Sequence, residues 1–282
     1  MGSLVEALQF GFMRNALLTG LLVSVACGVI GTFVVVKRIV FVSGGIAHAA
    51  YGGIGLGYFL GLDPVVGAIV FSLLAALGMG MVQRRTGERA DTLIGVMWAI
   101  GMAMGIILVD LTPGYKADLM SYLFGSILAV PSSDLLIMAI LDLVVVVLVL
   151  LFYKELLAIS FDEVFATVEN VPVNAIYLVL MALVALTVVM LMRVVGLILV
   201  IAMLTVPAAI SGRFVKDIQR MMVLASALGM LFMTTGLWLS YFLNLTSGAT
   251  IILVSGVAYL LSLGLEQVIG WTRATRSGVG RG

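Results

Sequence analysis

The sequence predicts an all-α membrane protein, organised as a single transmembrane domain over residues 1–282. The chain is 63% hydrophobic and only 10% charged, with a mean hydropathy of +1.26. A water-soluble fold of this size could not bury that much apolar surface. Apolar runs of about 20 residues recur along the whole chain, and this is the length that a helix needs to cross a bilayer. The runs are apolar on all sides, whereas barrel strands alternate in polarity, so the expected spans are helices.

Nine spans are expected from hydropathy and from the glycine, proline and polar residues between the apolar runs, with eight spans as the alternative. The segment 118–130 is too short to span, so it is expected to lie at an interface or to re-enter the membrane. The polar insertion 112–120 is expected to form part of an outer docking surface. The expected spans lie near residues 15–36, 40–61, 64–83, 92–111, 134–153, 174–192, 195–212, 220–243 and 247–267.

The basic residues are biased to one side of this arrangement. If the N-terminus is outside, only Arg14, Lys116 and Arg193 of the 15 basic residues fall on the outer side. The positive-inside rule therefore supports an outer N-terminus. The remaining basic residues fall on the cytoplasmic side: Lys37, Arg38, Arg84, Arg85, Arg89, Lys154, Arg213, Lys216, Arg220, Arg273, Arg276 and Arg281.

Composition excludes several classes of function. A net charge of +1 provides no basic surface for a nucleic-acid partner. Cys27 is the single cysteine, so neither an internal disulfide nor a cysteine-cluster metal site is expected. Glu6 and Arg14 interrupt the first turns, which argues against a cleavable signal peptide. No soluble domain that could bind ATP is expected.

The second span combines small residues with the only histidine of the chain. Gly44, His48 and Gly52 share one face, so the imidazole has a missing side chain one turn away on each side. Ionisable groups within a membrane mark transport pathways, and histidine is the commonest metal ligand. His48 is therefore predicted to be a metal ligand, with a structural hydrogen bond as the alternative. Small residues that repeat every four positions on the adjacent face predict close helix packing: Gly45, Ala49, Gly53, Gly57 and Gly61.

The fifth span contains a carboxylate, Asp142, where a charge costs about 2.5–3.5 kcal/mol. We hypothesise that Asp142 is a metal ligand together with His48. The alternative is a protonated carboxyl group that is bonded to a neighbouring serine or backbone carbonyl. Met97, Met102 and Met104 cluster in the fourth span. Thioethers suit soft ions, but methionine mostly fills irregular apolar space, and that is the expectation here.

A second polar insertion, residues 160–174, follows the fifth span on the cytoplasmic side. Asp162 and Glu163 favour the start of a helix, and Asn170 tolerates the left-handed conformation that ends one. The insertion therefore predicts a short amphipathic helix. A helix lying on the membrane surface is the alternative, but anionic lipid would repel its acidic residues, so a protein partner fits better. Three apolar side chains can share the face of this helix: Phe161, Phe165 and Val168.

These segments together resemble the permease subunit of the ABC importers for divalent metals, the zinc and manganese uptake class. The second-span sequence "SGGIAHAAYGGIGLGYFLG" is similar to the family motif S-D-A-I-S-H-A-V-L-P-G. The family's acidic residue falls at Gly44 here, so the acidic half of the Asp–His pair is absent, and the family's proline falls at Gly52. Five further segments occur in the family's order: "DTLIGVMWAIGMAMGIIL" (91–108), "DLMSYLFGSIL" (118–128), "LFYKELLAISFDEVFATVENVPV" (151–173), "VVGLILVIAMLTVPAAIS" (194–211) and "GLWLSYFLNLTSGATIILVSG" (236–256).

The resemblance implies a homodimeric permease in the inner or plasma membrane, surrounded by lipid. It implies two cytoplasmic ATP-binding subunits, which carry out ATP hydrolysis, and an extracytoplasmic metal-binding protein. The chain itself is then not an enzyme and binds no cofactor, and its cargo is a divalent metal. Segment 160–173 would be the coupling helix that docks on the ATP-binding subunit. The residues expected to couple the chain to that subunit are Asp162, Glu163, Ala166, Asn170 and Pro172.

Zinc is favoured over manganese as the cargo because imidazole suits zinc better. Two alternatives stay open: an ABC permease for an iron chelate or another small nutrient, and a stand-alone secondary transporter. An intramembrane serine hydrolase is excluded. Ser43 and His48 are five residues apart, which places them roughly 140° apart around a helix, and no second histidine exists.

Overall fold

The computed structural model describes residues 9–86, 90–113, 125 and 127–278. Among these residues there is no strand, and nine helices are long and apolar enough to cross a membrane. Their positions agree with the predicted spans. The helices are α2 (Gly11–Val36), α3 (Val40–Leu60), α4 (Pro64–Thr86), α5 (Ala90–Leu111), α7 (Ser132–Leu151), α10 (Val173–Val195), α11 (Leu197–Phe214), α12 (Ile218–Leu243) and α13 (Ser247–Gly278).

Two segments of the outer side fall mostly outside the described residues. The expected docking surface at 112–120 is described only at Thr112 and Pro113. Of the expected interfacial segment 118–130, the described part includes a single 3-10 turn, η1 (Ile127–Ala129).

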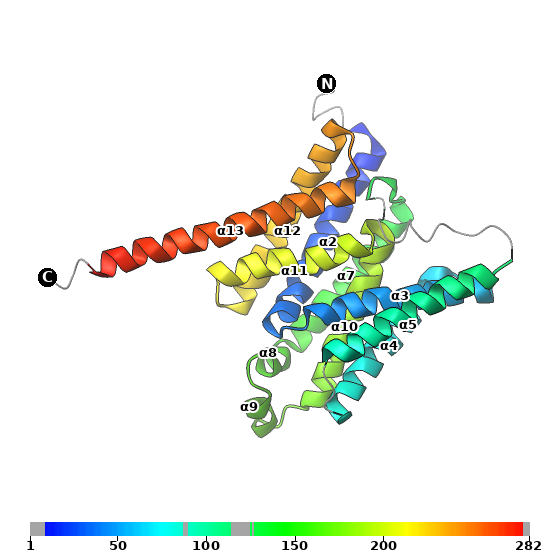
Figure 1. The fold of residues 1–282 in the computed structure, drawn as a ribbon, viewed down its shortest axis with the longest axis horizontal. Coiled ribbons are helices and arrows are strands. Elements are labelled where there is room, and N and C mark those ends of the chain that lie inside the picture. The colour runs from blue at the N-terminus through cyan, green and yellow to red at the C-terminus, as the bar shows by residue number, and fades with distance from the viewer. Residues whose placement is uncertain (1–8, 87–89, 114–124, 126, 279–282) are drawn as a thin grey trace.

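The helices form two groups around a central pair (Figure 1). Helices α3, α4 and α5 pack together, and α11, α12 and α13 form the other group. Between them, α2 packs against α11, α12 and α7, while α10 contacts α4, α3, α11 and α7. Helix α3 is the most thoroughly enclosed of the spans. Helix α13 continues well beyond the rest of the bundle toward the C-terminus.

Glycine lets α3 approach its neighbours closely. A Cβ added at Gly53 would overlap the carbonyl oxygen of Gly67 on α4, and one at Gly57 would lie 2.7 Å from Pro64 Cα. A Cβ at Gly45 would lie 2.9 Å from the side chain of Ile94 on α5. These distances are shorter than real Cβ contacts, so only glycine permits these crossings.

Gly61 differs from the other glycines of the stripe, and the packing role expected for it is not found. A Cβ at Gly61 would meet no described atom within 4 Å. Its backbone is left-handed, with φ of 67°, and its amide N–H bonds to the end of α3. Gly61 therefore ends the helix, because glycine adopts this conformation without a steric penalty.

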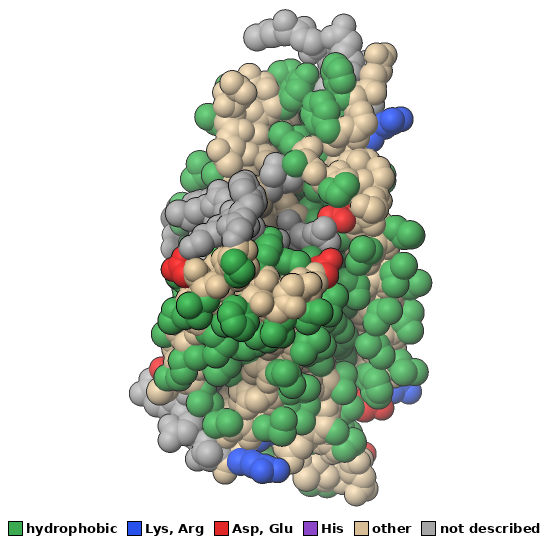
Figure 2. All heavy atoms as spheres, turned by 90° about the vertical axis from the view of Figure 1, so that its right-hand side faces the viewer, with side chains coloured by type: hydrophobic (Ala, Val, Ile, Leu, Met, Phe, Trp, Pro, Cys, Tyr) green, Lys and Arg blue, Asp and Glu red, His purple; other side chains and the backbone are tan. Residues whose placement is uncertain are grey.

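The surface suits a lipid environment. Figure 2 shows hydrophobic side chains over the broad middle of one face, with Lys and Arg toward its two ends. Outward-facing residues of α7 such as Leu136, Leu143 and Leu150 are each more than 60% exposed. Lipid tails would cover such residues, which would be costly to expose to water.

Each end of the bundle joins helices that are distant in sequence. At one end, the Asn15 Nδ2 of α2 donates to the Val130 carbonyl oxygen (3.0 Å) and the Ser132 hydroxyl (3.2 Å), so α2 and α7 begin side by side. At the other end, Lys37 and Arg84 lie together with the segment that follows α7. This second end is the one that the positive-inside rule assigns to the cytoplasm.

The packing of α3 against α4 predicts that the same substitution destabilises the protein at one glycine and not at another. Gly53→Ala should lower the thermal midpoint of the purified protein in detergent, because the new methyl group would overlap α4 backbone, and overpacking costs about 1–3 kcal/mol. Gly78→Ala on α4 is the matched control, since a Cβ there would meet nothing within 4 Å. Equal midpoints for the two variants would contradict the close α3–α4 crossing.

Candidate functional site

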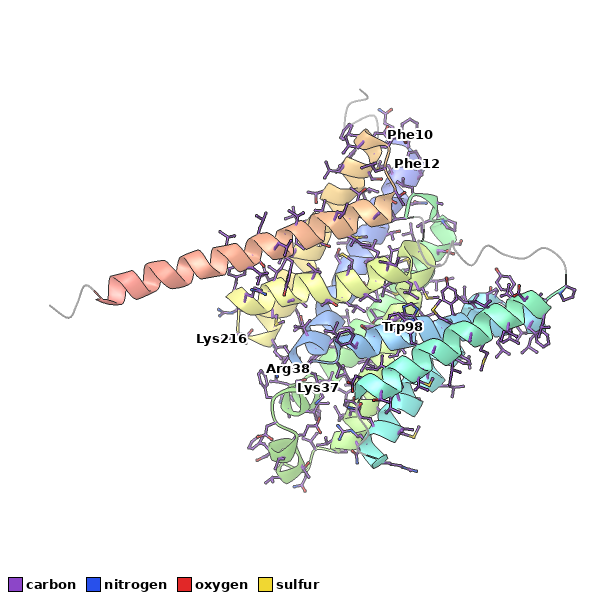
Figure 3. All side chains as sticks on the ribbon, viewed as in Figure 1. Phe10, Phe12, Lys37, Arg38, Trp98 and Lys216 are labelled. Atoms are coloured by element: carbon purple, nitrogen blue, oxygen red, sulfur yellow. The ribbon has the colours of Figure 1, made fainter. Side chains whose placement is uncertain are left out.

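His48 lies on α3 against α5 and is only 7% exposed. Its imidazole stacks on the indole of Trp98, with ring centroids 3.7 Å apart and an angle of 15° between the planes. Its Nδ1 lies 3.1 Å from the Met102 sulfur. Trp98, labelled in Figure 3, and Met102 are four residues apart on α5, so both face the same side of that helix.

The two glycines beside His48 have different surroundings. At Gly52, an added Cβ would lie 3.1 Å from the Phe71 ring of α4 and 3.2 Å from the Gly101 carbonyl oxygen of α5, so neighbours occupy that side. At Gly44, an added Cβ would meet one atom only, Ile201 Cδ1 at 3.7 Å, which is ordinary contact. Space for a further side chain therefore exists on the Gly44 side of the imidazole.

Asp142 lies on α7 and is 6% exposed. Its Oδ1 is buried, and no hydrogen-bond partner for it is found among the described residues. Asp142 interacts electrostatically with Cys27 of α2, and no interaction with His48 is found in the described part of the chain. The described residues also contain no group of three His, Cys, Asp or Glu side chains that could hold a metal ion. The structure therefore does not bring Asp142 and His48 together.

The insertion 160–174 contains one short helix, α9 (Glu163–Val168), as expected, and a separate helix, α8 (Tyr153–Phe161), directly precedes it. The break is at Asp162, whose backbone is extended and whose carboxylate accepts the amide N–H groups of Val164 (2.9 Å) and Phe165 (3.0 Å). This is the geometry of a helix N-cap. After α9, Asn170 takes the left-handed conformation expected of it, with φ of 60°, and Pro172 precedes α10.

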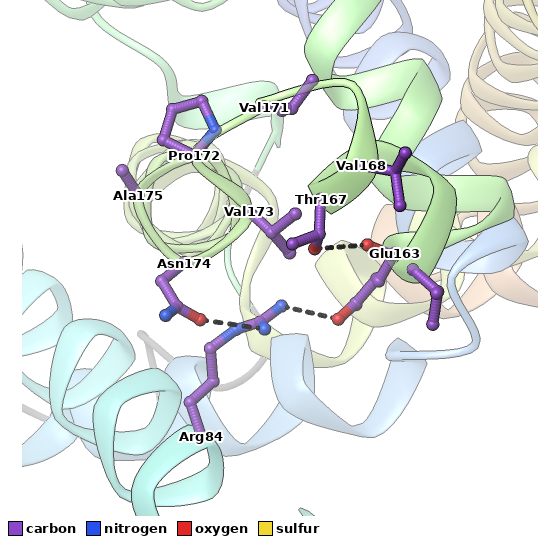
Figure 4. Close-up of a pocket in the computed structure, with 10 residues that line it drawn as sticks. Arg84, Glu163, Thr167, Val168, Val171, Pro172, Val173, Asn174 and Ala175 are labelled. Carbon is purple, nitrogen blue, oxygen red and sulfur yellow. Dashed lines mark hydrogen bonds and ion pairs between the residues drawn. The ribbon is translucent and has the colours of Figure 1, made fainter.

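Glu163 joins α9 to two spans. Its carboxylate bonds Lys37 Nζ at the end of α2 (2.5 Å) and Arg84 Nη2 in the last turn of α4 (3.1 Å). Figure 4 shows the Arg84 side chain between Glu163 and Asn174 of α10. Burial alone would raise the pKa of Glu163, but the hydrogen bond and charge of Lys37 and the charge of Arg84 outweigh it and hold that pKa below its ordinary value.

The two basic residues make further contacts that fix their positions. Lys37 Nζ also donates to the Ile159 carbonyl oxygen of α8 (2.7 Å). The Arg84 guanidinium lies 4.3 Å from the centroid of the Tyr177 ring on α10. Sequence reasoning identified Lys37 and Arg84 only as cytoplasmic charges. Their positions at the ends of two spans, opposite an acidic helix start, were the available signal for this cluster.

The side chains of α9 divide into an inner and an outer set. Glu163 points toward the spans, and Ala166 is fully buried. Beside α9 is a pocket of about 740 Å³ whose lining includes Arg84, Glu163 and Pro172 (Figure 4). The side chains on the side away from the spans are apolar and more than half exposed, and we call them the outer face of α9: Phe161, the last residue of α8, and Val164, Phe165 and Val168 of α9.

Comparisons with known proteins agree with this architecture. Residues 9–266 match the ABC 3 transport family. An uncharacterized membrane protein of Synechocystis sp. is 60% identical over 265 residues, covering 94% of each chain. The manganese transport system membrane protein MntC of Listeria monocytogenes is 37% identical, covering 90% of this chain and 91% of its own. The solved structure of PsaBC from Streptococcus pneumoniae in complex with Fab superposes with a TM-score of 0.82 at 36% identity, covering 92% and 93%.

The Glu163 bridge predicts a stability that depends on pH. Because its pKa is lowered in the folded protein, the bridge stabilises the fold fully above the ordinary carboxyl pKa, and this contribution is lost as the pH falls through the lowered pKa. Glu163→Gln should therefore lower the thermal midpoint at pH 7 by roughly 2–4 °C, on the order of 1 kcal/mol after solvent screening is allowed for.

The control is Glu169→Gln, which removes an exposed carboxylate for which no side-chain contact is found in the described structure. The midpoint difference between the Glu163 variant and the parent protein should shrink as the pH falls. An equal difference at neutral and acidic pH would contradict the bridge.

Proposed function

Because the chain belongs to the ABC 3 transport family, we propose that it is the permease subunit of an ATP-driven importer of divalent metal ions, with zinc carried in preference to manganese. Metal permeases are the class to which its named relatives belong, and the chain is a multi-pass helical membrane protein. The choice of ion, the direction of transport and the assembly are the proposal. In that assembly, two copies of the chain combine with two cytoplasmic ATP-binding subunits and an external metal-binding protein.

The observation that carries the proposal is that the two faces of α9 differ in their surroundings. Its outer face exposes apolar side chains at the cytoplasmic end, where lipid tails do not reach, so a protein partner would cover them. Its inner face is tied through Glu163 to α2 and α4. A displacement of α9 by an ATP-binding subunit would therefore reach two spans directly. A stand-alone secondary transporter would have no use for such a face.

The preference for zinc rests on the side chains next to the buried imidazole. The expected acidic partner is absent at Gly44, and Asp142 does not replace it, so no carboxylate is found paired with His48 among the residues that the structure describes. Manganese favours oxygen ligands, whereas imidazole suits zinc. His48 then acts as a transient ligand on the path, because an importer must release its ion.

The direct test is metal uptake into vesicles that contain the complete complex, with zinc and manganese measured in parallel. We expect zinc uptake in the parent complex and a loss of at least roughly tenfold in His48→Ala, with assembly and ATP binding unchanged. Full uptake by the variant would make His48 a packing residue. No metal uptake by the parent complex would overturn the proposed function and favour a chelated cargo.

The outer face of α9 gives a second prediction. Val168→Glu should reduce both the ATP-binding subunit recovered with the permease and the uptake per ATP hydrolysed, because it places a charge in an apolar contact. Val168→Ile, which keeps the face apolar, is the matched control and should behave as the parent. Normal coupling in the glutamate variant would show that the ATP-binding subunit does not dock on α9.

A further inference from the structure

The contact between His48 and Met102 brings two kinds of metal donor together inside the membrane-spanning region. The imidazole Nδ1 and the thioether sulfur are 3.1 Å apart in hydrogen-bonding geometry. In the tautomer that leaves Nδ1 unprotonated, its lone pair points in the same direction, toward the sulfur. The flat face of the imidazole is covered by Trp98, so the Met102 sulfur approaches an edge nitrogen.

The backbone of the two helices holds this pair in place. A Cβ on Gly101, next to Met102, would lie 2.5 Å from the Ala49 Cα, and one on Gly105 would overlap the Tyr51 carbonyl oxygen. Helices α3 and α5 are therefore in backbone contact beside the His48–Met102 pair. This contact fixes the backbones from which the two donor side chains extend.

The geometry suits an ion between the donors after a small movement of the flexible thioether. Zinc bonds of about 2.0–2.1 Å to histidine nitrogen and about 2.3 Å to thiolate sulfur place two donors roughly 3.5 Å apart at the tetrahedral angle, and the longer bond to a thioether needs a slightly larger separation. Methionine has three rotatable bonds and can make this adjustment. Of the three methionines that cluster on α5, Met102 contacts His48. Met104 lies two residues on, about 200° around the helix, and is 38% exposed.

We propose that Met102 is a second metal-ligating residue beside His48, and that this nitrogen–sulfur pair makes the permease select zinc over manganese. The inference rests on the proposed function and adds a ligand and a basis for selectivity. Thioether and imidazole donors favour zinc and softer ions, whereas manganese favours oxygen donors, and the side-chain partner found for His48 Nδ1 among the described residues is a sulfur. Because the protein supplies only two donors, water can fill the remaining coordination positions of the ion, and the ion can leave the site.

The test compares Met102→Leu with Met104→Leu in the same vesicle uptake assay, using Zn²⁺ and Mn²⁺ singly and in competition. We expect the zinc-to-manganese uptake ratio to fall about tenfold or more in Met102→Leu and to stay at the parent value in Met104→Leu. A purely packing role for Met102 would change uptake of both ions together, and an unchanged ratio in the Met102 variant would overturn the inference.

Two further variants keep the test decisive if Met102→Leu does not assemble. Met102→Gln has a similar length and offers an amide oxygen, so the ratio should move toward manganese. Gly44→Asp adds a carboxylate one turn before His48, where an added Cβ makes only ordinary contact, and should shift the ratio the same way. Unchanged ratios in both would overturn the inference.

The failure of the inference and the failure of the proposed function give different results. If the parent complex transports metal and all variants have the same zinc-to-manganese uptake ratio, Met102 is not a ligand, and the proposed permease function is unaffected. A parent complex that transports neither ion removes the proposed function itself.

Discussion

The carboxylate of Glu163 is the contact on which the cytoplasmic end of the protein depends. Helix α9 has six residues, too few to be stable alone, because nucleating a helix costs more than one turn returns. It is held by the Asp162 cap, by buried Ala166 and by the bridge from Glu163 to Lys37 and Arg84. The Glu163 side chain is 40% exposed, so solvent screening keeps the energy of the bridge modest. Its main effect is positional, since it fixes α9 relative to α2 and α4.

Within the membrane, close packing holds the helices together in place of the hydrophobic effect. Water does not drive helices together in lipid, so contact depends on how near their backbones can approach. Gly53 and Gly57 set the distance from α3 to α4, and Gly101 and Gly105 set the distance from α5 to α3. On α3, His48 directly precedes Ala49, which lies against Gly101 of α5. Gly45 and Gly52, which flank the histidine in the sequence, both contact α5, so their lack of side chains lets α5, with Trp98 and Met102, approach the imidazole.

The fold was predictable from sequence because apolar length alone decides a membrane span. The start and end of α9 were also readable, since Asp162 and Asn170 have local backbone roles. The site was less predictable, because helix pairing depends on contacts between distant residues. Nothing in the sequence measures the distance from His48 to Asp142 or to Met102, and the structure places the Met102 sulfur 3.1 Å from His48 Nδ1. Likewise, Glu163 was expected to face a partner subunit, yet its charge is satisfied by Lys37 and Arg84, which lie 126 and 79 residues away.

The chemistry of the buried site follows from what the bilayer tolerates. A carboxylate at Gly44 would give a divalent ion a charged ligand, but it would remain in the membrane after the ion had left, at a cost of a few kcal/mol. A neutral imidazole and a thioether carry no such cost when the site is empty. They also bind hard ions poorly, so under the proposed role of His48 and Met102 the donors that make the empty pathway tolerable would also discriminate against manganese. Ion selectivity and the stability of the unloaded permease would then have the same origin.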